Sequence, residues 1–260
     1  MGNSVKRESF DLFNQVSDLV RNLPPRGKIN LPIHDSLILA MYWRSLSLFR
    51  GVMTLLEKNL AEEALILGRS LFTESLWLIE LSEAEAHRAR LVLGWMRHSY
   101  EEIKGLFREA QRMGLDQNAG EVIAHYASQQ RKLQDYARRH GIGPFKKFRS
   151  QADAAKRFGR HDDYWTYLLS HEMVHGSDAA FVFRRRKINK DAFAMFSETT
   201  DPEIVEAVGA FAAKSLLAAA KATIHIFHWQ QPAEIDILYQ KLEALPALTG
   251  DPNKNGRFTN

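Results

Sequence analysis

Apolar residues recur along nearly the whole chain at steps of three and four, the spacing that lays one apolar stripe along an α-helix. The first such stretch covers residues 4–23 and ends at Pro24-Pro25, a typical helix stop. Further stretches share this period: 33–58, 61–81, 82–114, 116–140, 164–175, 202–229 and 234–245. No stretch alternates apolar and polar residues with the period of two that a half-buried strand has. The sequence therefore predicts an all-α fold built from long helices.

Local residue patterns predict where two of these helices begin and that a third one is buried. Ser82 and Glu85 have the spacing of a capping box, which predicts that a helix begins at Ser82. The pair Asp162-Asp163 stands before the 164–175 stretch and can cap its N-terminus. The 61–81 stretch is apolar on every side, which is typical of a central, buried helix.

The connections between the predicted helices are short, which favours neighbours that run antiparallel. We therefore expect a single-domain antiparallel helix bundle with long helices over residues 1–245. Residues 246–260 are rich in Gly, Pro and Asn, so we expect them to form a flexible C-terminal tail.

Composition narrows the class of protein. Of the 260 residues 45% are hydrophobic and 25% are charged, as in an ordinary globular domain. The absence of Cys excludes a disulfide framework and a thiolate zinc site. A net charge of +4 does not by itself indicate a nucleic-acid binder. The N-terminus has no apolar run of signal-peptide length, so we expect a cytoplasmic protein without a membrane segment.

One motif is typical of metal-dependent hydrolases. Residues 171–175 read His-Glu-x-x-His, which in zinc peptidases puts two imidazoles on one helix face and lets the Glu act as base toward a zinc-bound water. Glu198 lies at a suitable separation for a third ligand. One hypothesis is therefore a zinc metallohydrolase with His171, His175 and Glu198 as ligands and Glu172 as base. The alternative is that both histidines are partly buried and hydrogen-bonded to neighbours.

A second pattern overlaps this motif and extends to the 61–81 stretch. The residues that carry it are Arg69 within Ala64–Phe72, Tyr164, Tyr167, Leu168, Leu169, Ser170 and His175-Gly176-Ser177. The pattern resembles an uncharacterised bacterial family of all-helical proteins, a domain of unknown function. The chain departs from it in two places: Glu74 follows Arg69 by five residues instead of four, and Ser170 precedes His175 by five instead of four.

The resemblance implies a helical fold distantly similar to HEPN domains, which serve in bacterial toxins and phage defence, often as metal-independent ribonucleases. Their defining arginine followed by histidine after four to six residues is absent here. The positions that match imply a cofactor-free catalytic centre of Arg69, Tyr167 and His175. In such a centre, histidine would activate the ribose 2′-hydroxyl or protonate the leaving oxygen, and arginine would stabilise charge on the phosphorane.

The apolar surroundings of Arg69 support a polar cluster at this position. Arg69 lies in the apolar 61–81 stretch, and a buried guanidinium needs charged or hydrogen-bonding partners. Tyr167 and His175 share one face of the later helix, so a cluster of Arg69 with Glu74, a tyrosine and a histidine is geometrically feasible. The alternative is a buried polar network that only sets the register of the helices.

Basic residues flank the 164–175 stretch on both sides. Because Lys and Arg hold phosphate backbones, we expect RNA to contact these clusters. Their members are Lys146, Lys147, Arg149, Arg184, Arg185 and Arg186. The alternative is that they are merely solvated faces. A third hypothesis is a non-catalytic interaction module that forms a homodimer through an apolar helix face.

Overall fold

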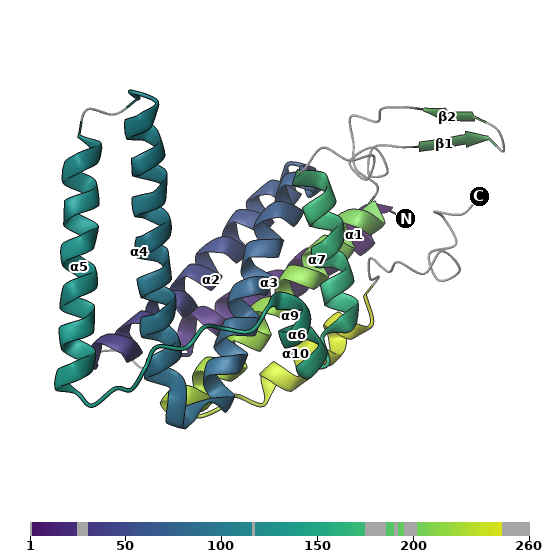
Figure 1. Cartoon of the computed structure of the whole chain (residues 1–260). Helices are drawn as coiled ribbons and strands as arrows, with labels where there is room; N and C mark the ends of the chain where they lie inside the picture. The colour runs from purple at the N-terminus through teal and green to yellow at the C-terminus, as the bar shows by residue number, and fades with distance from the viewer. Residues whose placement is uncertain are drawn as a thin grey trace. The chain divides into compact units, whose positions relative to one another are not determined.

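Long helices make up nearly all of the chain that the structure describes (Figure 1). The computed structural model describes residues 2–24, 31–115, 118–174, 186–189, 192–194 and 202–245, and for residues 2–6, 171–174, 186–189 and 192–194 it describes the backbone alone. The helices are α1 (Gly2–Asn22), α2 (Ile33–Glu57), α3 (Ala61–Glu83), the short 3₁₀ helix η1 (Glu85–His87), α4 (Arg88–Arg112), α5 (Ala119–Arg139), α6 (Gln151–Arg157), α7 (His161–Val174), α9 (Pro202–Phe227) and α10 (Glu234–Glu243). The all-α prediction is confirmed.

Most helix ends lie where local chemistry places them. α1 ends at Asn22, two residues before Pro24. Asn59, just after α2, has a φ of 59°, in the left-handed region that asparagine and glycine adopt at helix C-termini. These ends depend only on nearby residues, so the sequence alone predicts them.

The capping-box prediction at Ser82 is wrong. Ser82 lies inside α3, and its hydroxyl donates to the carbonyl of Ile79. A serine hydroxyl can bond backward to a carbonyl as well as forward to an N–H group, and residue spacing does not distinguish the two cases. The predicted cap before α7 also differs, because α7 begins at His161 and both Asp162 and Asp163 lie in its first turn.

A short hairpin is a further departure from the sequence-based prediction. Strands β1 (Arg186–Asn189) and β2 (Ala192–Ala194) pair antiparallel, with Lys187 opposite Phe193. Strands of three and four residues are too short for a period of two to be visible in the sequence.

Contacts divide the chain into two compact units. Unit 1 comprises Met1–Ile29, Leu39–Ser82 and Arg149–Asn260, and unit 2 comprises Asn30–Ile38 and Glu83–Phe148. The single domain over residues 1–245 stays a prediction. The expected tail at 246–260 lies outside the described residues.

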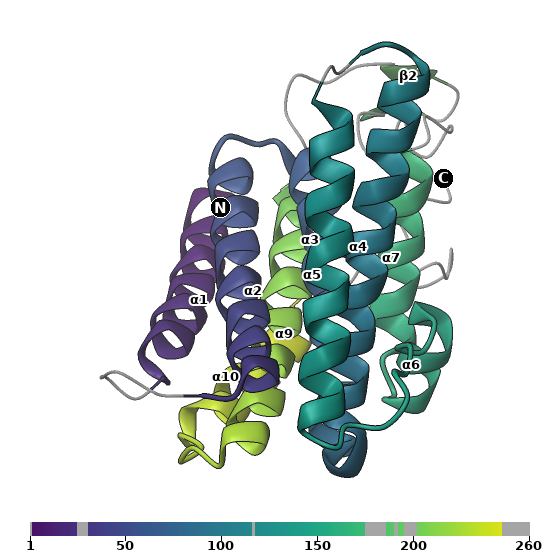
Figure 2. The same ribbon diagram turned by 60° about the vertical axis from the view of Figure 1, so that its left-hand side comes forward.

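The core of unit 1 surrounds α9, most of whose residues are buried. α1 lies beside α9 in both views (Figures 1 and 2). The two helices approach so closely that a Cβ atom on Gly209 would lie 2.3 Å from the Phe13 ring. The sequence predicts α3 as the central helix, but α9 takes that place, because its many alanines let neighbours pack closely on all sides. On α3, by contrast, Ile66 is exposed.

Unit 2 is built on α4 and α5, which run side by side (Figure 2). Its small core contains Leu93, Leu133 and Ala137. The segment after α5 crosses α4 at Gly94, where a Cβ atom would lie 2.0 Å from the carbonyl oxygen of Lys146. Only glycine leaves room for this crossing.

Candidate functional site on helix α7

Helix α7 rests on α3 and α9 through a row of aromatic rings. Tyr164 and Tyr167, three residues apart on α7, share a helix face. Their rings stack with centroids 5.5 Å apart and planes 14° apart. Tyr167 also contacts Phe72 of α3, at 5.8 Å between centroids, and Phe72 contacts Phe211 of α9 at 5.5 Å. Phe72 is fully buried, so this row is part of the core and holds α7 in place.

Arg69 of α3 extends this row. Its guanidinium carbon lies 5.0 Å from the centroid of the Tyr167 ring, within the range of cation–π attraction. The Arg69 side chain is half-buried, whereas the sequence predicts full burial. Among the residues that the structure describes, no carboxylate forms an ion pair with it. The structure thus brings two of the three predicted site residues together and leaves the Arg69 charge without an acidic partner in the described ranges.

Glu74 faces a different helix. Its Oε1 lies 2.8 Å from Nη1 of Arg44 on α2, and the Ser45 hydroxyl donates to its Oε2 at 3.3 Å. Burial raises the pKa of Glu74 to about 7, against the lowering effects of the Arg44 charge and the Ser45 hydrogen bond. Five residues turn an ideal helix by about 140°, so Arg69 and Glu74 point to different neighbours. The predicted cluster of Arg69 with Glu74 therefore does not form.

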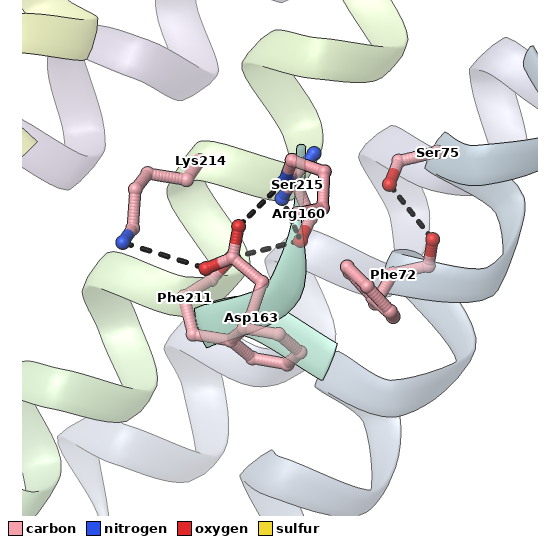
Figure 3. Close-up of polar contacts among 7 residues, drawn as sticks. All are labelled: Phe72, Ser75, Arg160, Asp163, Phe211, Lys214 and Ser215. Atoms are coloured by element: carbon pink, nitrogen blue, oxygen red, sulfur yellow. Dashed lines mark hydrogen bonds and ion pairs between the residues drawn. The ribbon is translucent and has the colours of Figure 1, made fainter. Parts of the chain in front are cut away.

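A buried charged cluster lies at the start of α7 (Figure 3). Arg160, only 7% exposed, donates from Nε to Oδ2 of Asp163 at 2.5 Å. The other oxygen of Asp163, Oδ1, lies 3.4 Å from Nζ of Lys214 on α9. Burial by itself would raise the pKa of Asp163, but the charges and hydrogen bonds of Arg160 and Lys214 outweigh it and lower the pKa below its usual value. Asp163 is therefore ionised at neutral pH and joins α7 to α9.

The guanidinium of Arg160 has further contacts within unit 1. Its Nη2 donates to the Ser215 hydroxyl at 3.4 Å, and its carbon lies 5.3 Å from the centroid of the Phe72 ring. Its third nitrogen, Nη1, is buried and has no hydrogen-bond partner among the residues that the structure describes. Both guanidinium groups near α7 thus lie over rings of the same aromatic row, Arg69 over Tyr167 and Arg160 over Phe72.

Several predicted site residues fall beyond what the structure describes. Nothing is described for His175, Arg184, Arg185 and Glu198. The backbone alone is described for His171, Glu172 and Arg186. The catalytic role of His175 and the zinc ligand set therefore stay predictions.

Lys146, Lys147 and Arg149 are the basic residues before α7 that were predicted to contact RNA, and they differ in exposure and in pairing. Lys147 is exposed and Lys146 is half-buried. Arg149 donates from Nη1 to Oε1 of the buried Glu80 at 2.8 Å, and its backbone N–H donates to Oε2 at 3.1 Å. The charge of Arg149 is thus engaged within the protein, whereas Lys147 presents its charge to solvent.

The sequence alone does not predict the cluster of Arg160, Asp163 and Lys214. It predicts Asp163 as part of a helix cap, a role that suits a surface residue. One signal was available: Lys214 and Ser215 are adjacent polar residues within residues 207–220 of α9, which are otherwise apolar. Polar residues in such a helix need partners from another element.

Two kinds of feature are not found among the described residues. No group of three His, Asp or Glu side chains in those ranges could hold a metal ion. Nor does any described helix have the length and apolar character needed to cross a lipid bilayer.

A protein-family model matches the chain. The model of a family described as a family of unknown function (DUF5677) matches residues 35–192, more than half of the chain. The matched segment includes Arg69, Arg160 and Tyr167, whereas Lys214 lies beyond it. No curated protein and no solved structure matches the chain.

Proposed function

The chain belongs to the family of unknown function DUF5677, and from the contacts of α7 we propose that it acts on RNA, as a bacterial defence or stress module, at a metal-independent centre of Arg69, Tyr167 and His175. The observation that carries this proposal is the Arg69 guanidinium over the Tyr167 ring, with no acidic partner among the described residues. An arginine that only stabilised the fold would be expected to have a carboxylate partner. A half-buried arginine that lacks one is suited to an anionic ligand.

The Arg69 contact supports a role toward phosphate. The Arg69 guanidinium lies over the Tyr167 ring, and no described residue accepts a hydrogen bond from its N–H groups, so these groups suit the oxygens of a phosphate. The aromatic row under Tyr167 is buried, so the ring itself is held rigidly. Such a preorganised cation lowers the energy of a transition state in which negative charge builds up on phosphorus-bound oxygens.

His175 would supply the proton transfer. The ribose 2′-oxygen would lose its proton and attack the adjacent phosphorus, and the 5′-oxygen of the next nucleotide would leave with a proton. The products would be a 2′,3′-cyclic phosphate and a 5′-hydroxyl end. The proton lost by the 2′-hydroxyl equals the proton gained by the leaving 5′-oxygen, so the step balances without water or a metal. Histidine suits either transfer because its ordinary pKa lies near neutrality.

Cleavage of a labelled single-stranded RNA in the presence of a chelator tests the proposal. We expect wild-type protein to cleave, and both R69A and H175A to lose at least about 100-fold in rate, the usual loss when a transition-state contact is removed. Y167F should keep most activity because it retains the ring, whereas Y167A should lose it.

The matched control is R50A, because Arg50 is an exposed arginine on α2 in the same unit. It should cleave at the wild-type rate. Cleavage that R69A and H175A leave intact would refute the centre, and loss of cleavage on chelation would refute its metal independence. Metal analysis of the purified protein tests the zinc hypothesis separately: about one equivalent of zinc, lost in H171A, would support it. Absence of both RNA cleavage and salt-dependent RNA binding would favour the interaction module.

A further inference from the structure

The cluster at the start of α7 contains more positive than negative charge. Arg160 and Lys214 supply two cations, and among the described residues Asp163 supplies the one carboxylate that forms an ion pair with them. Asp163 is shared between the two cations through its two oxygens, as Figure 3 shows. One unit of positive charge is therefore left over in a place from which water is largely excluded.

One nitrogen of Arg160 also lacks a partner within the described part of the chain. Nε and Nη2 donate to Asp163 and Ser215, but Nη1 is buried, and no described residue accepts a hydrogen bond from it. The Arg160 side chain as a whole is 7% exposed, so bulk solvent does not compensate for this. A buried donor without an acceptor costs about 1–3 kcal/mol, more when it is charged, and such groups usually have an unseen water or ion beside them.

From these two observations we propose that Nη1 of Arg160 binds a small monovalent anion, of which chloride is the physiological example. An anion accepts the two N–H groups of Nη1 and at the same time offsets the surplus charge of the cluster. A water molecule satisfies only the first requirement. A phosphate or sulfate ion brings several oxygens and, at neutral pH, close to two charges, whereas the cluster offers one free nitrogen and one surplus charge.

The site differs from the proposed RNA centre in its accessibility. Arg69 is half-buried and can meet a phosphate of a large ligand, whereas Arg160 is nearly enclosed by α3, α7 and α9 and can admit only a small ion. Anion binding there would hold α7 more firmly on α9. The inference therefore stands independently of any action on RNA.

Thermal unfolding of the full chain in potassium chloride and in potassium gluconate, at equal concentration, tests the site. We expect a Tm higher by about 3 °C in chloride, as a tenfold excess of ligand over its Kd produces in a protein of this size. Bromide, which has the same charge and a similar radius, should act like chloride. R160Q removes the guanidinium that binds the anion, so its Tm should be the same in chloride and in gluconate.

Two lysines of α9 provide a matched pair. K214Q removes the surplus charge and should reduce the chloride effect, whereas K221Q, in which the lost lysine pairs with Asp236 at 2.8 Å, should leave it unchanged. D163N removes the carboxylate and raises the surplus positive charge of the cluster to two, so it should enlarge the Tm difference between chloride and gluconate. This variant keeps the proposal testable even if R160Q does not fold. An equal Tm in chloride and gluconate for the wild type, or the same chloride effect in K214Q and K221Q, would overturn it.

Discussion

Buried carboxylates pair with cations from other segments of the chain in the described part of unit 1. The pairs are Glu74 with Arg44, Glu80 with Arg149 and Asp163 with Lys214. Each pair ties two segments that are distant in sequence. Removing Arg44 or Arg149 leaves a buried carboxylate without a paired cation, which is strongly destabilising, whereas Asp163 keeps Arg160 when Lys214 is lost. These pairs therefore favour one arrangement of the helices.

Glu74 makes stability depend on pH near neutrality. Its folded-state pKa of about 7 lies above the ordinary value of 4.5, so the folded chain holds this proton more tightly than the unfolded chain does. The resulting stabilisation is fully present below about pH 4.5 and is lost as the pH rises through 7. We expect the free energy of unfolding to fall by up to about 3 kcal/mol between these limits because of Glu74.

Urea unfolding of wild type and E74Q across pH 5 to 8 measures this effect. Glutamine keeps the shape but does not titrate, so the difference in unfolding free energy between the two proteins should change steadily with pH over this range. Other titrating groups contribute equally to both proteins and cancel. A constant difference would show that Glu74 titrates at its ordinary pKa.

At the scale of elements, α1 and α9 approach each other closely at Gly209. A Cβ atom there would lie 2.3 Å from the Phe13 ring, and Phe13 is fully buried and cannot swing away. We expect G209A to lower the free energy of unfolding by about 1–3 kcal/mol, the usual cost of overpacking a core. Chemical denaturation measures the change.

Gly105 on α4 is the matched control, since a Cβ atom there would meet nothing within 4 Å. G105A should raise the unfolding free energy by about 0.5–1 kcal/mol, because alanine favours a helix more than glycine does. If G209A were as stabilising as G105A, α1 and α9 could not be packed as closely as described.

At the scale of the whole molecule, the two units have cores of very different size. The core of unit 1 draws on α1, α2, α3, α9 and α10, whereas the cluster between α4 and α5 consists of Leu93, Leu133 and Ala137 with a few half-buried neighbours. A larger buried apolar core gives a higher free energy of local opening. The amides of α9 should therefore exchange with solvent more slowly than those of α4 and α5.

Hydrogen exchange followed by mass spectrometry tests this difference. L133A should speed exchange in α4 and α5 by removing a buried side chain, a change that usually costs about 2–5 kcal/mol, and should leave α9 at its wild-type rate. The converse variant L216A should speed exchange in α9. Equal acceleration of both units by L133A would mean that they open as one cooperative body.

The helices themselves were predictable because their determinants are local. Apolar spacing, Pro24 and Asn59 act through neighbours within a turn or two of the same helix, and the observed ends of α1 and α2 agree with them. The sequence also predicted the proximity of Arg69 to Tyr167 as feasible, because a guanidinium in an apolar helix needs partners and Tyr167 lies on a face that carries polar groups.

The choice of partners among charged residues was decided by tertiary packing. Asp163 and Lys214 lie about fifty positions apart, and nothing in either local sequence specifies that α7 meets α9 at that point. The same holds for Glu74, which pairs across to α2 instead of joining Arg69. The helical fold and the residue types capable of chemistry thus follow from local sequence. Which charges are balanced follows from the packing of the helices, because that balance depends on distances between segments remote along the chain and on the exclusion of water from between them.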